Sequence, residues 1–347
     1  MFVARSTHQF APSPLSRRFS IAPMMAYTTR DFRYLARLLT RHTLLYTEMV
    51  VAQAVIHGDR ERLLGYHPQE HPLAVQLGGS DPASLAEAAR ICADYGYAEI
   101  NLNVGCPSDR VQQGKIGAVL MAEPDLVARC VGAMANACEV PITVKTRIGI
   151  DDQDDYRFLH HFVARMRDAG CRSLTIHARK AILAGLSPKE NRDIPPLLYE
   201  RAYAIKKDFP ELEIILNGGL RDVPEMMTHL DQVDGLMVGR EAYQNPFFLA
   251  GVDGVVFGDP APAPSRRQVA EAFLPYVEQR YAEGTHPKHV LRHALNLFQA
   301  VPGARAYRRH LSSHMNDPQA TPAVFEQALA RLGHDDHATT PSPLPAS

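Results

Sequence analysis

The chain has 347 residues, of which 46% are hydrophobic and 22% are charged, with 22 Gly and 26 Pro. These values exclude a disordered chain, a collagen-like repeat and a disulfide scaffold. The mean hydropathy is -0.20, and no apolar run approaches the roughly 18 residues of a membrane span, so we expect no transmembrane helix. A net charge of -1 gives no overall attraction to nucleic acids or membranes.

The charges are nevertheless unevenly distributed along the chain. Residues 266–310 contain eight Lys or Arg and three Asp or Glu. Clustered cations favour a polyanionic partner, because they release the counterions of phosphates. A solvated helix face explains the same cluster equally well.

Five cysteines are scattered along the chain without a C-x-x-C pair or a Cys/His cluster at zinc spacing. They suit a reducing cytoplasm, and we expect no metal site. The N-terminus carries Arg5, Arg17 and Arg18 but no apolar core between them, so we predict no secretory signal.

Eight short apolar segments alternate with helical patterns. Pro82, Pro124 and Val223-Pro224 follow acidic residues and mark helix starts. This order favours an α/β fold, a (β/α)8 TIM barrel of parallel strands, over a doubly wound sheet, because polar and Gly residues recur where the segments end. The predicted strands cover residues 19–24, 44–50, 73–79, 98–106, 142–149, 173–179, 213–219 and 235–240.

Composition divides the chain beyond the barrel. A Gly/Pro/Ala-rich stretch has the composition of a linker, helical periodicity follows it, and the last residues are too polar to fold. We predict an N-terminal extension (residues 1–18), a barrel (19–250), a linker (251–265), a small all-helical C-terminal domain (266–333) and a disordered tail (334–347).

One helical pattern in the C-terminal domain is well defined. Apolar residues between 290 and 298 recur at spacings of three, four and seven, which predicts one packed face. His289, Arg292 and His293 are expected to face elsewhere.

Glycines lie in the turns at the ends of the last two predicted strands, in Asn217-Gly218-Gly219 and Gly239-Arg240. Glycine lets backbone N–H groups approach an anion, and the loops after strands 7 and 8 are the frequent phosphate site of barrels. Arg240 could add a charge-assisted contact. Either turn alone reads as a tight turn, but together they predict a phosphate-bearing cofactor.

Two cations end the apolar stretches of neighbouring predicted strands, Lys145 in strand five and His177 in strand six. In one barrel mouth they could hold negative charge on a cofactor such as a reduced flavin. Gln76 could pair with a ring that carries donors and acceptors. Pro23-Met24-Met25 could form a shelf under it, although a structural role is the default interpretation of these four residues when each is taken alone.

Cys106 closes the fourth predicted strand between Gly105 and Pro107, on the strand that carries Asn103. A thiol at this end faces the predicted mouth and could act as a general acid. The basic loop after strand six carries Lys189 and Arg192. If a nucleic acid enters the mouth, these two could hold its phosphates, opposite Arg305 and Arg308 of the helical domain.

Several segments together resemble the tRNA-dihydrouridine synthases. They are APMM, NLNVGCPS, GKIGAVLM, VKTRIG, HARKAILAGLSPKENR, NGG and VGR, within residues 19–315. SPKENR and GARAYRRHLS are similar to the A subfamily in particular. The combination is specific, whereas NGG or VGR alone would mean little.

The resemblance implies an FMN enzyme that reduces the 5,6 double bond of D-loop uridines 20 and 20a in tRNA, with NADPH or NADH as reductant. It implies that Cys106 donates the proton to C5 while hydride from flavin N5 reaches C6. The implied flavin contacts are Pro23, Met24, Met25, Gln76, Lys145, His177, Asn217, Gly218, Gly219, Gly239 and Arg240. The implied tRNA contacts are Asn103, Lys189, Arg192, Arg305 and Arg308. A monomer is expected.

Two alternatives stay open at this point. One is an FMN barrel that acts on a free small molecule, such as a dihydropyrimidine or an enone, and loss of the basic C-terminal domain would leave its activity intact. The other is an RNA-binding or tRNA-folding module whose flavin chemistry is dispensable. The sequence does not distinguish NADPH from NADH, because it contains no dinucleotide fingerprint.

Overall fold

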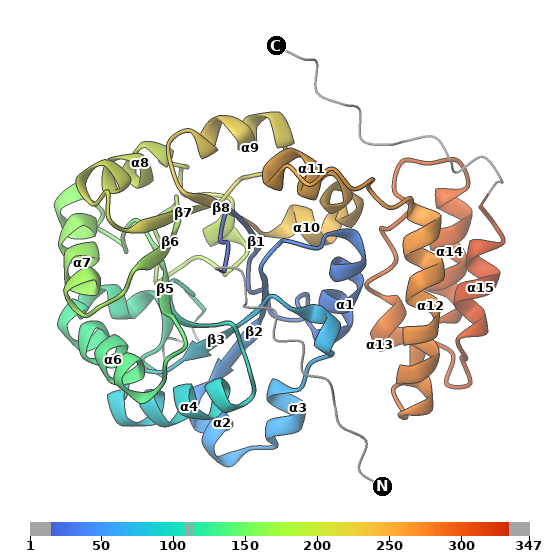
Figure 1. The fold of residues 1–347 in the computed structure, drawn as a ribbon, viewed down its shortest axis with the longest axis horizontal. Coiled ribbons are helices and arrows are strands. Elements are labelled where there is room, and N and C mark those ends of the chain that lie inside the picture. The colour runs from blue at the N-terminus through green and yellow to red at the C-terminus, as the bar shows by residue number, and fades with distance from the viewer. Residues whose placement is uncertain (1–14, 109–111, 113, 333–347) are drawn as a thin grey trace, which may run out of the picture.

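The computed structural model describes residues 15–108, 112 and 114–332, and its eight parallel strands form a barrel ringed by helices (Figure 1). The predicted TIM barrel is therefore confirmed. Hydrogen-bonded neighbours follow the order β1-β8-β7-β6-β5-β4-β3-β2. The strands are β1 (Phe19–Ile21), β2 (Leu45–Val51), β3 (Leu73–Gly78), β4 (Glu99–Val104), β5 (Ile142–Arg147), β6 (Ser173–His177), β7 (Glu213–Asn217) and β8 (Gly235–Val238).

The barrel closes between its first two strands. Ser20 and Leu44 form a parallel bridge. The Ile21 amide donates to the Leu44 carbonyl at 3.0 Å, and the Leu44 amide donates to the Phe19 carbonyl at 3.1 Å. This closure satisfies backbone groups that would otherwise form exposed sheet edges.

Helices surround the barrel, and the predicted helix starts at Pro82, Pro124 and Val223 are confirmed. The Asp81 and Asp222 side chains accept backbone amides of the first turn, which satisfies donors that have no partner within the helix. The helices of this part are α1 (Arg30–Leu39), α2 (Ala52–His57), α3 (Arg60–Leu64), α4 (Pro82–Asp94), α6 (Pro124–Ala137), α7 (Tyr156–Asp168), α8 (Tyr199–Asp208), α9 (Val223–Leu230), α10 (Arg240–Gln244) and α11 (Val252–Phe257). Short 3-10 turns are η1 (Pro68–Glu70), η2 (Gly117–Ala122), η3 (Glu190–Arg192) and η4 (Pro246–Gly251).

Two apolar cores hold this architecture. The larger lies between strands and helices, where Val75, Leu102 and Val144 are fully buried. A smaller cluster that includes Tyr46 and Met237 is formed by residues from β2, β3, β7 and β8 and from the adjoining segments. Because side chains alternate along a strand, one face of each strand packs on helices and the other fills the barrel.

A charged cluster ties the chain before β1 to the barrel strands. Arg17 lies 2.5 Å from a Glu99 oxygen and 2.9 Å from a Glu213 oxygen, and the Tyr46 hydroxyl also donates to Glu99. Arg17 belongs to the predicted extension 1–18, so the end of that segment contacts the barrel strands. Residues 1–14 lie outside the described residues.

Four helices stand beside the barrel next to α1 (Figure 1). They are α12 (Arg266–Ala282), α13 (Pro287–Leu291), α14 (Ala304–His314) and α15 (Ala323–Leu329). Their core contains Phe273 edge-on to Phe325 and Phe298 against Tyr307, with ring centroids 6.1 and 4.9 Å apart. The predicted linker 251–265 contains α11, which buries Val252 and Val256. The predicted tail 334–347 lies outside the described residues.

The sequence expectation for His293 is wrong. α13 ends at Leu291, so the 3.6-residue periodicity does not continue through the next residues. The chain turns there instead, and His293 is buried rather than outward-facing. Among the described residues, no helix combines the length and apolar character that a membrane span requires.

Candidate active site

A chain of polar side chains runs through the barrel interior. Thr143 donates to Glu99 at 2.6 Å, and Asn101 donates to Thr143 at 2.8 Å. Gln76 Nε2 donates to Asn101 at 2.8 Å, and Asn103 Nδ2 donates to Gln76 Oε1 at 2.8 Å. Gln76 is therefore buried but fixed, with its orientation set by two neighbouring amides.

The same chain of hydrogen bonds reaches Cys106. Asn103 Oδ1 accepts the backbone amides of Gly105 at 3.1 Å and Cys106 at 3.0 Å. The Cys106 carbonyl accepts the Ala118 amide at 2.9 Å. Cys106 is half-buried and free of any disulfide, and these contacts fix its backbone at the end of β4.

Lys145 points at the end of β7. Its amine donates to Asn217 Oδ1 at 2.9 Å, and Asn217 Nδ2 donates to the Met237 carbonyl at 2.6 Å. Burial, and then the charge of Arg147, lower the pKa of Lys145 to about 7. An anion bound beside this amine would favour its charged ammonium form.

His177 lies beside the glycine turn after β7. Its Nδ1 is buried without a hydrogen-bond partner in the described part of the chain. Burial, and then the charges of Arg147 and Lys145, lower the pKa of His177 well below its ordinary value. At neutral pH the ring is therefore uncharged, and its orphaned nitrogen is available to a ligand.

The two glycines of this turn are needed for conformation and space. Gly218 and Gly219 have φ values of 112° and 73°, where other residues are strained. A Cβ on Gly218 would lie 3.2 Å from His177 Nε2, and one on Gly219 would lie 2.6 Å from the Tyr199 hydroxyl. The Tyr199 hydroxyl fixes the turn by donating to the Gly218 carbonyl at 2.9 Å.

The turn after β8 carries the other predicted phosphate residues. Gly239 precedes α10, which starts at Arg240. Arg240 Nη2 donates to an Asp193 carboxylate oxygen at 2.7 Å. Arg240 therefore joins the end of β8 to the basic loop after β6.

The segment Pro23-Met24-Met25 follows β1, as predicted for a shelf at the mouth. Pro23 and Met24 are half-buried, while Met25 is 64% exposed. A methionine that is exposed at strand ends offers a polarizable apolar surface to a flat ring.

Arg147 lies among these residues, and the sequence analysis missed it. It is buried, and its guanidinium donates to the carbonyls of Gly105 at 2.9 Å, Lys180 at 2.9 Å and Asn191 at 3.1 Å. It therefore joins the Cys106 strand end to the basic loop. The available signal was a second charged residue within the predicted strand segment VKTRIG.

Asn191 is a second missed residue, fully buried in the loop after β6. Its Oδ1 accepts the Ile182 amide at 2.7 Å, and its Nδ2 donates to the Ile182 carbonyl at 2.9 Å and the Leu186 carbonyl at 3.2 Å. One side chain thus fixes the loop that presents Lys189 and Arg192.

Of the residues predicted to contact tRNA, three lie at the barrel mouth and two lie on the helical region. Lys189 and Arg192 are exposed on the loop beside Arg240, and Asn103 is buried beneath Cys106. Arg305 and Arg308 are exposed on α14 of the helical region, with no contact to the mouth residues in the described chain.

The donor set fits an anionic, flat cofactor. The Lys145 amine, the orphaned His177 Nδ1 and the Gly218-Gly219 turn lie at one end of the barrel, where strands five to seven finish. A cluster of cations and backbone turns at these strand ends is typical of phosphate and cofactor sites in barrels.

Residues 20–332 match the family model described as dihydrouridine synthase. The chain belongs to this family. It is therefore an oxidoreductase of the dihydrouridine synthase family, and the resemblance carried by the quoted motifs is confirmed.

The relatives extend over nearly the whole length of this dihydrouridine synthase family member. A protein from Vibrio cholerae is 55% identical over 322 residues, 92% of this chain and 98% of the relative. One from Pseudomonas aeruginosa is 56% identical, covering 93% of this chain and 97% of the relative. Both are named tRNA-dihydrouridine(20/20a) synthase.

A solved structure is similar in fold. The old yellow enzyme homologue from Zymomonas mobilis has a TM-score of 0.50 at 14% identity, with 71% of this chain and 90% of that chain covered. At this identity the likeness concerns the barrel architecture alone.

Proposed function

We propose that this protein is an FMN-dependent tRNA-dihydrouridine synthase that reduces the C5–C6 double bond of uridines 20 and 20a in the tRNA D-loop, with NADPH or NADH as reductant. The observation that carries the proposal is the placement of the half-buried Cys106 at the barrel end where the Lys145 amine also lies, among residues that match the family. The names of the relatives from Vibrio cholerae and Pseudomonas aeruginosa support the substrate.

FMN, when bound, would supply the hydride that reaches C6 of uracil. For its ring we assign the shelf Pro23-Met24-Met25 and the amide of Gln76, and for its negative charge Lys145 and His177. The phosphate would be held by the turn residues Asn217, Gly218, Gly219, Gly239 and Arg240. Their backbone turns and charges support this division.

Cys106 Sγ holds the proton that C5 requires. Addition of a hydride at C6 leaves negative charge at C5, so C5 needs a proton donor. A nearby acid prevents the formation of a free carbanion. Asn103 and Arg147 position this residue through its backbone, since they bind the Cys106 amide and the Gly105 carbonyl.

The uridine must leave its stack to reach the barrel mouth. We assign phosphate contacts to Lys189 and Arg192 on the loop fixed by Asn191, and to Arg305 and Arg308 on α14, with Asn103 facing the nucleotide. The exposure of these four cations supports the assignment. The five free cysteines suit a cytoplasmic location, where tRNA is matured.

The test is product formation with defined tRNA. Purified protein, NADPH and tRNA transcribed without modifications should yield dihydrouridine, detected by mass spectrometry of nucleosides and mapped to positions 20 and 20a. FMN should be released on denaturation. A flavin-loaded protein that leaves such tRNA unchanged while reducing a free pyrimidine or enone would contradict the proposal.

A further inference from the structure

Tyr27 lies at the tip of a rigid turn after β1, and the function described so far does not use it. The Met24 amide donates to Thr28 Oγ1 at 2.9 Å, and the Thr28 amide donates back to the Met24 carbonyl at 2.9 Å. Ala26 has a φ of 63°, and its amide donates to Glu48 Oε1 at 2.6 Å. These contacts fix the backbone that carries Tyr27 at the end of β1.

The Tyr27 ring is stacked on a second tyrosine. Its centroid lies 4.2 Å from that of Tyr243, with 18° between the planes. Tyr243 packs in turn on Phe32 at 5.2 Å and edge-on to His293 at 5.6 Å. His293 Nε2 lies 2.9 Å from Thr29 Oγ1. The Tyr27 ring is therefore supported by residues from the turn after β1, from α1 and α10, and from the segment after α13.

One part of Tyr27 stays open, because the residue is 37% exposed while Tyr243 covers a ring face. The exposed part of a prepositioned ring is available to a ligand. Single strands of nucleic acid bind to such rings, since every base has a π-face that can stack.

Tyr27 is also close to the charged groups of the mouth. Arg147 donates to the carbonyls of Gly105 and Asn191, the chain neighbours of Cys106 and Arg192, so the basic loop lies beside the Cys106 strand end. Tyr27 stacks on Tyr243 of α10, the helix that begins at Arg240. Arg240 Nη2 reaches the Arg192 carbonyl at 3.4 Å, so the basic loop is held at this place.

We propose that the exposed part of Tyr27 is a stacking subsite for an unpaired RNA base that neighbours the uridine at Cys106, with Arg192 binding the phosphate between the two nucleotides. The inference rests on the proposed function. It adds a binding site that accepts any base through its face and helps to hold the substrate while the uridine is out of its stack.

The chain contains no tryptophan, so Tyr27→Trp introduces a single tryptophan whose emission can be followed in the holoenzyme. We expect unmodified tRNA to quench its emission in a saturable way, because a stacked base quenches an indole. The control is Tyr281→Trp on α12, which replaces another exposed tyrosine, 43% exposed, and should not respond. An unchanged spectrum of Tyr27→Trp at saturating tRNA would overturn the proposal.

Substitution gives a second measurement that does not depend on fluorescence. Tyr27→Leu should raise the KM for tRNA and the Kd for tRNA about tenfold, whereas Tyr27→Phe should leave both near wild type. The kcat at saturating tRNA and the rate of flavin reduction by NADPH should stay unchanged. Tyr281→Leu is the matched control and should bind tRNA as wild type does.

Two results would contradict the stacking subsite. Wild-type tRNA affinity in Tyr27→Leu would show that no base rests on the ring, and slower flavin reduction in that variant would assign the ring to the cofactor instead. Failure of the proposed function looks different. In that case wild type forms no dihydrouridine, although the tRNA Kd and the quenching still report on Tyr27.

Discussion

Lys145, Arg147 and His177 are basic residues at the ends of two neighbouring barrel strands, and each has a lowered pKa. Burial lowers the pKa of Lys145 to about 7 and that of Arg147 to about 10, and it lowers the pKa of His177 well below its ordinary value, so that His177 is neutral. The repulsion between the charged forms of Lys145 and Arg147 is partly relieved when an anion enters. The site is thus electrostatically suited to a negatively charged cofactor.

The pH dependence of cofactor binding follows from Lys145. An anion that contacts the ammonium raises its pKa, so affinity is highest below about pH 7 and falls by up to about tenfold per pH unit above it. His177 does not contribute there, because its pKa is lowered and it stays neutral. Anaerobic titration of reduced FMN, whose ring carries the negative charge, into the cofactor-stripped protein between about pH 7 and about pH 9 measures this.

The matched variant for this titration is Lys145→Met, which keeps the length of the side chain and removes the charge. Its FMN affinity should be weaker at pH 7 and should lack the decline that wild type shows at higher pH. Equal pH profiles for the two proteins would contradict a contact between Lys145 and the cofactor.

Cys106 gives a second prediction at this scale. Cys106→Ala should keep the flavin spectrum and the tRNA Kd, because Asn103 binds the backbone and not the thiol of residue 106. Turnover should fall at least about a hundredfold, the usual effect of a general acid. Single-turnover reduction of tRNA measures it, with the buried Cys171→Ala as control. Wild-type turnover in Cys106→Ala would exclude the thiol as proton donor.

Sequence patterns predicted the residues whose chemistry stands out against an apolar strand, such as Cys106 and Lys145. They missed Arg147 and Asn191, because the function of these two is to bind backbone carbonyls of distant segments. Which carbonyls lack a partner is decided by the fold, so the sequence marks Arg147 only as a charged residue in a strand segment and does not show what it binds.

The loop after β6 shows how one side chain controls an element. Asn191 binds Ile182 and Leu186, and its own carbonyl accepts from Arg147. The loop carries Lys189 and Arg192 on its exposed side. Its order is therefore a condition for presenting both cations to a substrate.

Asn191→Ala should disorder this loop while the barrel stays folded. It leaves buried backbone groups without partners, at a cost of about 1–3 kcal/mol for each. We expect faster proteolysis between residues 183 and 190 and weaker tRNA binding, measured by limited digestion and by titration. Asn316→Ala, at an exposed asparagine with one hydrogen bond at 3.2 Å, is the control. Equal digestion of both variants would contradict the role of Asn191.

Elements were predicted well where periodicity is long and helix starts are marked, as for the strands and for the helices at Pro82 and Pro124. His293 was misjudged because periodicity assumes that a helix continues, whereas α13 stops at Leu291. Only the tertiary contacts with Phe32 and Tyr243 explain why its ring is buried.

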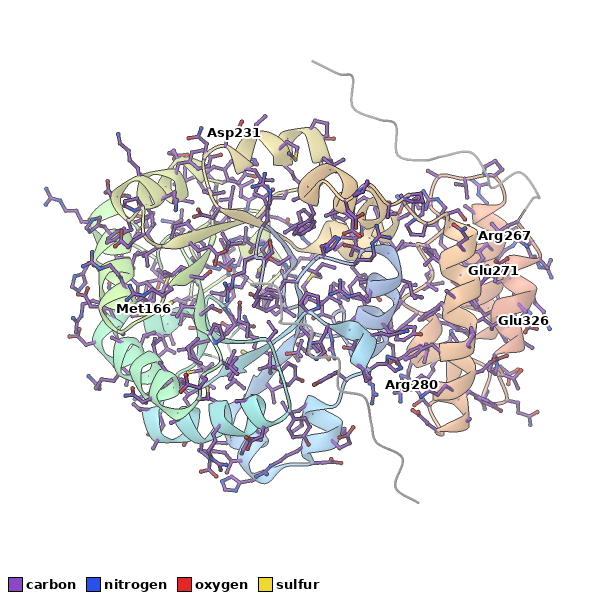
Figure 2. All side chains as sticks on the ribbon, viewed as in Figure 1. Met166, Asp231, Arg267, Glu271, Arg280 and Glu326 are labelled. Atoms are coloured by element: carbon purple, nitrogen blue, oxygen red, sulfur yellow. The ribbon has the colours of Figure 1, made fainter. Side chains whose placement is uncertain are left out.

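The whole molecule is held together across α1. Asp31 on this helix accepts the Tyr276 hydroxyl at 2.8 Å and Arg280 Nε at 2.9 Å, both from α12. Figure 2 shows Arg280 where α12 borders the barrel. This contact fixes the helical region, with its exposed arginines on α14, relative to the mouth.

Asp31→Ala should uncouple the two parts. Removing one partner of a buried charge pair costs about 3–5 kcal/mol. We expect tRNA reduction to fall strongly, whereas flavin content and the oxidation of NADPH by oxygen should stay near wild type. Glu283→Ala removes the more exposed partner of Arg280 and should change stability by less than about 1 kcal/mol. If the Asp31→Ala variant forms dihydrouridine in tRNA at the wild-type rate, the contact between α1 and α12 is not needed for activity on tRNA.

The central claim is that this barrel transfers reducing equivalents from a nicotinamide through FMN to tRNA. The most direct test is anaerobic: the yellow protein is reduced with NADPH, tRNA without dihydrouridine is added, and the absorbance of oxidised flavin is followed. We predict rapid reoxidation by this tRNA but not by free uridine or fully modified tRNA. Reduced flavin that persists in the presence of unmodified tRNA would contradict the claim.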